Sequence, residues 1–212
     1  MIGHSIETAR RSKLFDRIVV STDDAEISTV AREFGAEVPF TRPAALADDH
    51  TGTTEVIAHA VEWFRAQGNT VAEVCCIYPT APFIKSEDLK EGLRLIQTGR
   101  WRFVFAATRF AAPVYRAFRQ TGDGGLEMLF PDNFNVRSQD LPDVLHDAGQ
   151  FYWGRAEAWL SRARVFDRES TVVPIPLWRV QDIDTEEDWQ YAEAMATHLG
   201  INRPGDGGTS SK

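Results

Sequence analysis

The sequence predicts an α/β domain whose sheet is mostly parallel and is covered by helices on both faces. Short apolar runs rich in Val and Ile alternate with amphipathic stretches of about a dozen residues, a length typical of the helix between two parallel strands. The apolar runs lack the strict alternation of a strand with one wet face. The 212-residue chain is long enough for one such domain, which we place at residues 1–200.

The first segments alternate strand, helix and strand. Residues 17–21 (Arg-Ile-Val-Val-Ser) predict a strand buried on both faces. Asp23, with Glu26 three residues later, has capping-box spacing and predicts the start of a helix, which Gly35 closes. Residues 36–40 then predict a second short strand.

The middle of the chain continues the alternation. A helix is expected at about residues 53–68, and the most apolar strand at 72–78. Ser86 can cap a helix that ends at Gly99, and residues 102–108 predict another strand.

The periodicity breaks between residues 113 and 142. Glycines, a proline and an asparagine interrupt short aromatic-rich runs, which predicts an excursion of hairpins and loops. Order returns with a strand at 146–154, a short helix at 155–160 and a strand at 171–177. Asp184 or Thr185 then caps a last helix that reaches Leu199. The small, polar, Gly-rich tail at 201–212 is expected to be disordered.

Composition excludes some classes of partner. The net charge of −8 argues against nucleic acid or an anionic membrane as the main partner. The sequence has no apolar run approaching 18 residues and no signal peptide, so a cytoplasmic location is expected. Cys75 and Cys76 lie in the predicted buried strand, where cysteine behaves as a small apolar residue.

Asp182 and Asp184 are candidate metal ligands. Residues two apart in extended backbone point to the same side, so both carboxylates can face one cation. A few oxygen ligands completed by water and phosphate suit Mg²⁺. The alternative is that Asp184 only caps the last helix and Asp182 is solvated.

Other polar residues follow predicted strands, where ligands bind in parallel sheets. Arg42 could donate to a base or phosphate, and Thr51 and Thr53 lead into a helix. Tyr78 precedes a proline at the end of the most apolar strand. The run 146–153 mixes polar and aromatic residues, as sugar-binding sites do. Each also fits a capped surface helix or a half-buried strand. No Ser or Cys nucleophile motif occurs.

Taken together, these stretches resemble the acylneuraminate cytidylyltransferase family, which makes CMP-activated acidic sugars. Order and spacing agree from Met1 to about Leu199, and Tyr78 with the run 147–153 is most similar to the pseudaminic acid branch. The matching segments are 15–24, 42–49, 78–83, 137–142 and 182–185.

The resemblance implies a Rossmann-like fold and a reaction between CTP and a nine-carbon 2-keto acid sugar that gives the CMP-sugar and pyrophosphate. It implies a homodimer joined through the excursion, with Arg116 near a neighbour's site. It also implies roles for individual residues: Arg42, Thr51 and Thr53 at the base; Tyr78, Gln150, Tyr152, His146 and Arg137 around the sugar; Asp182 and Asp184 on Mg²⁺.

The family also opens with a strand and a phosphate-binding loop, to which nothing in this sequence corresponds; Met1 falls in the helix that follows them. Two alternatives therefore stay open. One is a non-catalytic or inactive paralogue that binds sugar or a full-length partner. The other is a cytidylyltransferase for another acidic sugar, such as N-acetylneuraminic acid.

Overall fold

A computed structural model describes residues 1–48 and 50–201. It confirms the α/β class and most predicted elements to within a few residues. The main elements are α1 (Ile2–Ser12), α2 (Ala25–Glu33), α3 (Thr53–Ala66), β1 (Glu73–Ile77), α4 (Ser86–Gln97), β2 (Phe103–Arg109), β3 (Phe118–Gln120), β4 (Leu126–Met128), β5 (Leu145–Arg155), α5 (Ala156–Leu160), β6 (Ser170–Pro174), the short 3-10 helix η5 (Leu177–Arg179) and α6 (Glu186–His198).

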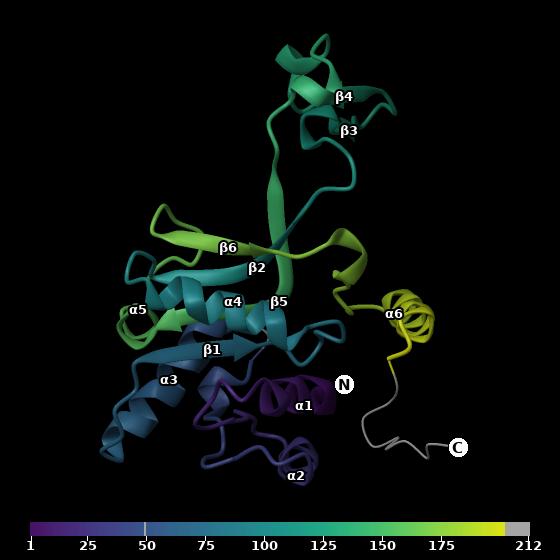
Figure 1. Cartoon of the computed structure of the whole chain (residues 1–212). Helices are drawn as coiled ribbons and strands as arrows, with labels where there is room; N and C mark the ends of the chain where they lie inside the picture. Colours follow the sequence, from purple (N-terminus) through teal and green to yellow (C-terminus); the bar gives the residue numbers. More distant parts are fainter. Residues whose placement is uncertain (49, 202–212) are drawn as a thin grey trace.

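The central sheet has four strands in the order β1-β5-β2-β6. β6 pairs in parallel with β2, whereas β5 pairs antiparallel with both β1 and β2. Three strands therefore run in one direction and β5 runs in the other (Figure 1). The expected tail lies outside the described residues apart from Ile201.

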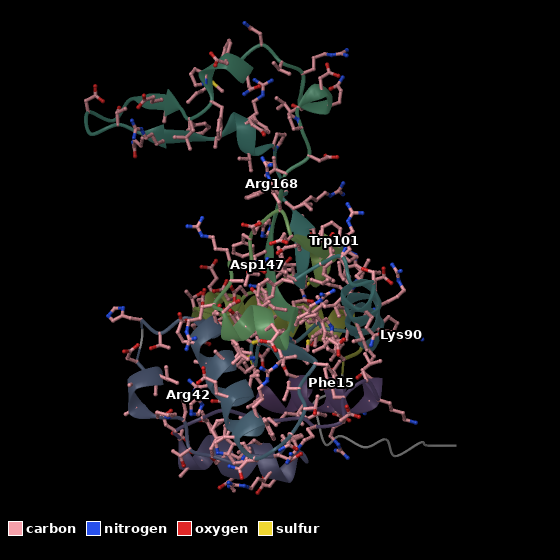
Figure 2. The ribbon with its side chains drawn as sticks, turned by 90° about the vertical axis from the view of Figure 1, so that its left-hand side faces the viewer. Phe15, Arg42, Lys90, Trp101, Asp147 and Arg168 are labelled. Atoms are coloured by element: carbon pink, nitrogen blue, oxygen red, sulfur yellow. The ribbon has the colours of Figure 1, made fainter. Side chains whose placement is uncertain are left out.

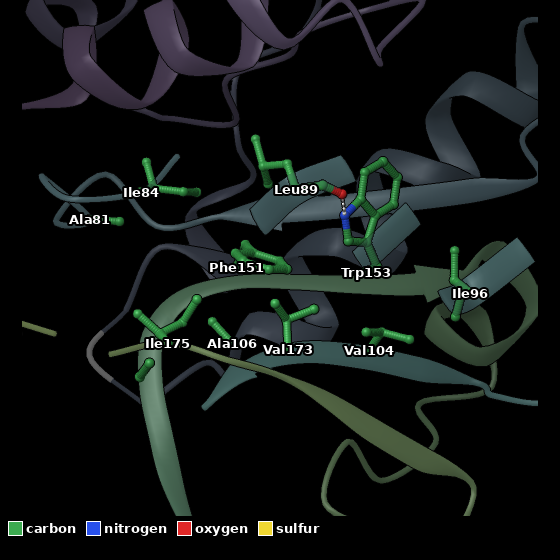
Figure 3. Close-up of a cluster of buried hydrophobic side chains, with 11 residues drawn as sticks. Ala81, Ile84, Leu89, Ile96, Val104, Ala106, Phe151, Trp153, Val173 and Ile175 are labelled. Carbon is green, nitrogen blue, oxygen red and sulfur yellow. Dashed lines mark hydrogen bonds between the residues drawn. The ribbon is translucent and has the colours of Figure 1, made fainter. Parts of the chain in front are cut away.

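Helices cover both faces of the sheet, as predicted. Val104 and Ala106 of β2 point to one face, where they join a buried cluster with α4 (Figure 3). Phe103 and Phe105 point to the other face, where Trp159 of α5 packs. This alternation along one strand divides the core into two layers.

The N-terminal strands predicted at 17–21 and 36–40 are reduced to a single parallel bridge between Val19 and Glu37. Only two backbone hydrogen bonds join them, from Val20 N to Glu37 O (2.9 Å) and from Glu37 N to Ile18 O (2.8 Å). Within the described residues neither run pairs with the four-stranded sheet. Their apolar, β-branched composition favours strands, but strands form only where a neighbouring strand is available to pair with them.

Two predicted caps lie one residue away from the actual ones. Asp24, not Asp23, caps α2 by accepting from Ile27 N (2.8 Å). Lys85 precedes α4, so Ser86 is its first residue and not its cap. Such one-residue offsets are common at helix ends.

The predicted excursion is confirmed and stands away from the sheet (Figure 1). It holds the β3–β4 hairpin and several 3-10 turns. The Arg116 guanidinium donates to the carbonyl oxygens of Phe134 (2.6 Å) and Val136, so it ties the excursion to itself. Within the described residues, no helix combines the length and hydropathy needed to cross a membrane.

A wide bulge interrupts β5 where it crosses β2. Phe105 is paired with Tyr152, but Ala107 is paired with Asp147, so four residues of β5 lie opposite the single Ala106. Gly149 adopts a positive φ of 61° in this bulge. Bulges turn side chains away from the regular alternation of a strand and are common beside active sites.

Candidate active site

A cavity of about 160 Å³ lies on the α3–α5 side of the sheet. Helix α3 contributes its first residues, β1 contributes the residue that follows it, and β5 contributes residues on both sides of its bulge. The lining residues are Thr53, Thr54, Tyr78, Asp147, Tyr152, Trp159, Val165 and Phe166. The cavity thus includes Thr53, Tyr78 and Tyr152 of the predicted site residues.

Hydrogen bonds connect the polar lining residues. The hydroxyl groups of Thr53 and Tyr78 lie 2.8 Å apart. The Tyr152 hydroxyl donates to Asp147 Oδ2, while Asp147 Oδ1 accepts from Gly149 N at 3.0 Å. Burial, together with the neighbouring Asp147 carboxylate, raises the pKa of Tyr152. Tyr152 is therefore neutral and Asp147 can still accept from a ligand.

Aromatic and aliphatic side chains also line the cavity. Trp159 is fully buried, and its Nε1 donates to Val74 O at 3.4 Å. Phe166 packs edge-to-face on Phe105 with ring centroids 5.1 Å apart. A cavity lined by hydroxyls, a carboxylate and apolar side chains suits a sugar derivative that carries apolar substituents.

Asp182 and Asp184 lie between η5 and α6. Thr185 caps α6: its Oγ1 accepts from Asp188 N (3.2 Å), and Asp188 Oδ2 accepts from Thr185 N (2.9 Å). The alternative that Asp184 caps this helix is therefore wrong. The Asp184 carboxylate is left for another role.

The Asp182 carboxylate lies against the β5 bulge. A β-carbon on Gly149 would stand 3.5 Å from Asp182 Oδ2. Partial burial raises the pKa of Asp182, and the negative charges of Asp184 and Asp147 raise it further. Three further carboxylates, those of Asp184, Asp147 and Asp188, thus repel the Asp182 carboxylate, and a bound cation would relieve this repulsion.

Mg²⁺ fits the oxygen donors of this pair, because it needs only one or two carboxylates besides water and phosphate. Among the described residues, no group of three or more His, Cys, Asp or Glu side chains could by itself hold a metal ion. The phosphates of a ligand would have to complete such a site.

The two remaining residues predicted for the base do not line the cavity. Arg42 donates from Nε to Ser21 Oγ (3.2 Å) and from Nη2 to Ser21 O. It lies well below Asp147 in the view of Figure 2. The Thr51 hydroxyl donates to Asp48 Oδ1 (2.8 Å) just before α3. This hydroxyl and two backbone amides hold the pKa of Asp48 below its usual range.

Three predicted sugar contacts also lie outside the cavity lining. His146 packs on Phe110 with ring centroids 4.7 Å apart. Arg137 lies in the excursion and pairs with Asp140 (2.9 Å). Gln150 is 1% exposed and donates from Nε2 to Arg179 O at 2.7 Å, so it faces the loop that carries the acidic pair.

Several residues that line the cavity were not predicted individually as site residues, namely Asp147, Thr54, Trp159, Val165 and Phe166. One signal pointed to Asp147: an Asp two residues before a glycine favours a local turn in which the carboxylate accepts a backbone N–H. No local signal marks Val165 or Phe166, which reach the cavity from a loop before β6.

Known proteins provide independent comparisons. A family model described as cytidylyltransferase matches residues 1–113. The chain is 38% identical to the pseudaminic acid cytidylyltransferase of Campylobacter jejuni over 92% of this chain and 84% of that protein. It is 24% identical to the N-acylneuraminate cytidylyltransferase of Escherichia coli over 91% of this chain and 45% of that protein.

Among solved structures, a CMP-2-keto-3-deoxy-manno-octonic acid synthetase in complex with CTP aligns with a TM-score of 0.61 at 14% identity. The alignment covers 94% of this chain and 87% of that one. At this identity the likeness establishes the fold alone.

Proposed function

The chain belongs to the cytidylyltransferase family, and we propose that it transfers CMP from CTP to pseudaminic acid. The observation that best supports this proposal is the 38% identity to a pseudaminic acid cytidylyltransferase across 92% of the chain. Identity to the N-acylneuraminate enzyme of Escherichia coli is lower, at 24%. The products are the CMP-sugar and pyrophosphate.

We assign the cavity beside β5 to the sugar. Thr53, Tyr78, Tyr152 and Asp147 offer hydroxyl and carboxylate groups to sugar hydroxyl and amide groups, while Phe166 and its neighbours cover apolar substituents. The Asp147 carboxylate would repel the carboxylate of the substrate. The sugar's own acid group therefore points out of the cavity, and its neutral substituents point in.

The nucleotide is assigned to the segment that leads into α3. Arg42, Thr51 and Thr53 lie on the polar loop before this 14-residue helix and at its first residue. Thr53 also lines the sugar cavity, so this loop connects the two substrates. Arg42 holds Ser21 through Nε and Nη2, and its Nη1 would donate to the base.

In the reaction, the anomeric oxygen of the sugar forms a bond to the α-phosphorus of CTP as the bond from that phosphorus to the β-phosphate oxygen breaks. The proton of the anomeric hydroxyl leaves to solvent or a base, and pyrophosphate departs with the bonding electrons. Asp182 and Asp184 would hold Mg²⁺, which when bound neutralises phosphate charge. The cavity residues orient the sugar hydroxyl for attack.

A homodimer formed through the excursion completes the proposal. Phe118, Leu126, Leu129 and Phe134 of the excursion are each more than half exposed. Apolar side chains gathered on one projecting segment are typical of a surface that a partner covers. A second copy of the chain is the partner proposed here.

Pyrophosphate release in the presence of CTP and Mg²⁺ tests the substrate assignment. Pseudaminic acid should support a rate at least about tenfold above that with N-acetylneuraminic acid, because lost or misplaced hydrogen bonds in a polar pocket cost roughly this much or more. Equal rates with both sugars would refute the preference. Release with neither would refute the activity.

A further inference from the structure

We propose that Gln150 and the Arg179–Asp88 ion pair are positioning residues that fix the acidic loop, residues 180–184, against the β5 bulge. The inference rests on the proposed function, because it takes Asp182 and Asp184 of this loop as the Mg²⁺ ligands. It gives Gln150 a different task from the sugar contact that the resemblance implied.

Gln150 joins the sheet to the start of the loop. Its side chain is 1% exposed, and Nε2 donates to the backbone oxygen of Arg179 at 2.7 Å. Its Oε1 has no hydrogen-bond partner among the described residues. A buried, half-satisfied amide is a poor choice for stability alone, since an apolar side chain of similar size would avoid the desolvation penalty.

The side chain of Arg179 provides a second attachment for the start of the loop. The side chain is 6% exposed and pairs with Asp88 through two hydrogen bonds of 2.6 and 3.0 Å. The same guanidinium reaches Phe83 O at 3.4 Å. Asp88 lies in the first turn of α4. The planar Arg179 guanidinium therefore attaches the loop to a helix on the face of the sheet opposite α5.

The far end of the loop has its own anchor. Thr185 and Asp188 form the capping box of α6, and Gln181 Nε2 also donates to Asp188 Oδ1 at 3.2 Å. Residues 180–184 therefore span two fixed points. Between them Asp182 rests on Gly149, the residue next to Gln150 in the bulge.

Consecutive bulge residues thus make both contacts: Gly149 against Asp182, and Gln150 with Arg179 O. Loss of the Gln150 bond would release the start of the loop without removing a carboxylate. Metal binding should then weaken through lost preorganisation, as happens when residues behind metal ligands are replaced.

The test is Gln150→Met, which keeps the volume but cannot donate to Arg179 O. Two quantities are measured: the Mg²⁺ concentration for half-maximal pyrophosphate release, and the affinity for Mn²⁺ by electron paramagnetic resonance with CTP but without sugar. Both should weaken by about 5–10-fold, the value of one buried hydrogen bond. The KM for the sugar should stay within about twofold, since Gln150 lies outside the cavity lining.

Val104→Ala is the matched control. Val104 lies in the buried cluster between the sheet and α4, so its truncation should lower the melting temperature, yet the Mn²⁺ affinity should not change. Arg179→Lys is the second variant if Gln150→Met does not fold. It keeps the charge beside Asp88 without the planar fork and should shift Mn²⁺ affinity in the same direction.

These measurements distinguish the positioning role of Gln150 from the assignment of Asp182 and Asp184 to the metal. Unchanged Mn²⁺ affinity in a folded Gln150→Met enzyme would overturn the positioning role while leaving the proposed function intact. A wild-type enzyme that binds no Mn²⁺ in the presence of CTP would overturn the metal assignment and the positioning role together.

Discussion

At the scale of single residues, Asp182 and Asp184 lie just before α6 but do not cap it. Thr185 and Asp188 cap the helix reciprocally, so Asp184 is not needed for that purpose. Asp182 lies against the β5 bulge and near three other carboxylates, those of Asp184, Asp147 and Asp188. The proposed cation would offset this crowding of negative charge.

Asp184→Asn should lower turnover at ordinary Mg²⁺ concentrations by about 10² or more, because it removes a negative ligand that aligns the phosphates. The melting temperature should stay the same, since the capping box of α6 remains. Steady-state kinetics and thermal unfolding measure the two effects.

Glu193→Gln is the control for this substitution, since it removes an exposed charge from the body of α6. It should leave both turnover and melting temperature unaltered. Turnover retained by Asp184→Asn would refute the metal assignment.

The hydroxyl of Tyr152 provides a second test at this scale. Tyr152→Phe removes the donor to Asp147 at the sugar cavity. The KM for the sugar should rise about tenfold, the loss expected for one hydrogen bond to a charged group, while the KM for CTP changes little.

Tyr191→Phe is the matched control, because Tyr191 is 55% exposed on α6 and does not line the cavity. Its kinetics should equal those of the wild type. An unaltered sugar KM in Tyr152→Phe would remove this tyrosine from the sugar site.

Sequence patterns were informative for some site residues and not for others. The position of Tyr78 after an apolar strand correctly indicated that it lies at the cavity. The spacing of Asp182 and Asp184 indicated a pair of carboxylates just before the last helix, where the structure has them. The resemblance implied a sugar contact for Gln150, whereas the bulge in β5 directs its side chain toward Arg179 O, outside the cavity lining. Bulge positions depend on tertiary pairing, which the local sequence does not encode.

At the scale of elements, strongly apolar strands were predicted well and weakly paired ones were not. β1, β2 and β5 appear where the apolar runs predict them. Residues 17–21 and 36–40 have similar composition but form only one bridge. Strand formation depends on the neighbouring strand, so composition alone overestimates it.

The adjacent cysteines of strand β1 should make the free energy of unfolding depend on pH in the alkaline range. Burial raises the pKa of Cys76 from 9.0 to about 12 and raises that of Cys75 as well. Above pH 9.0 the unfolded thiols lose protons that the folded ones keep, so the free energy of unfolding falls as pH rises toward 12. Below pH 9.0 this stabilisation is fully present.

Urea unfolding at several alkaline pH values measures this fall. A Cys75→Ala, Cys76→Ala variant should lose less stability over the same pH range, because it has no thiols to ionise in the unfolded state. Identical pH dependence of the two proteins would contradict burial of the thiols.

At the scale of the whole molecule, the excursion divides the chain into a compact α/β body and a projecting segment (Figure 1). The break in periodicity predicted the excursion, but no pattern in the sequence shows how far it projects. The resemblance implied a sugar contact for Arg137, which lies in the excursion and pairs with Asp140.

Dimerisation through the excursion is tested by Phe118→Asp combined with Leu126→Asp. These side chains are 62% and 68% exposed in the isolated chain, so the charges should not unfold the body but should prevent burial against a partner. Light scattering after size-exclusion chromatography should give a dimer mass for the wild type and a monomer mass for the variant. Tyr191→Asp, on α6, should remain dimeric; a monomeric wild type would refute the interface.

The central claim is transfer of the α-phosphoryl group of CTP, with its cytidine, to pseudaminic acid. Incubation with CTP labelled at the α-phosphorus tests it most directly. We expect the label in a CMP-sugar identified by mass spectrometry, whereas label placed on the γ-phosphorus should be released only as pyrophosphate. Recovery of the α-label solely in CTP and its hydrolysis products, with no CMP-sugar formed, would show that the protein does not catalyse this transfer.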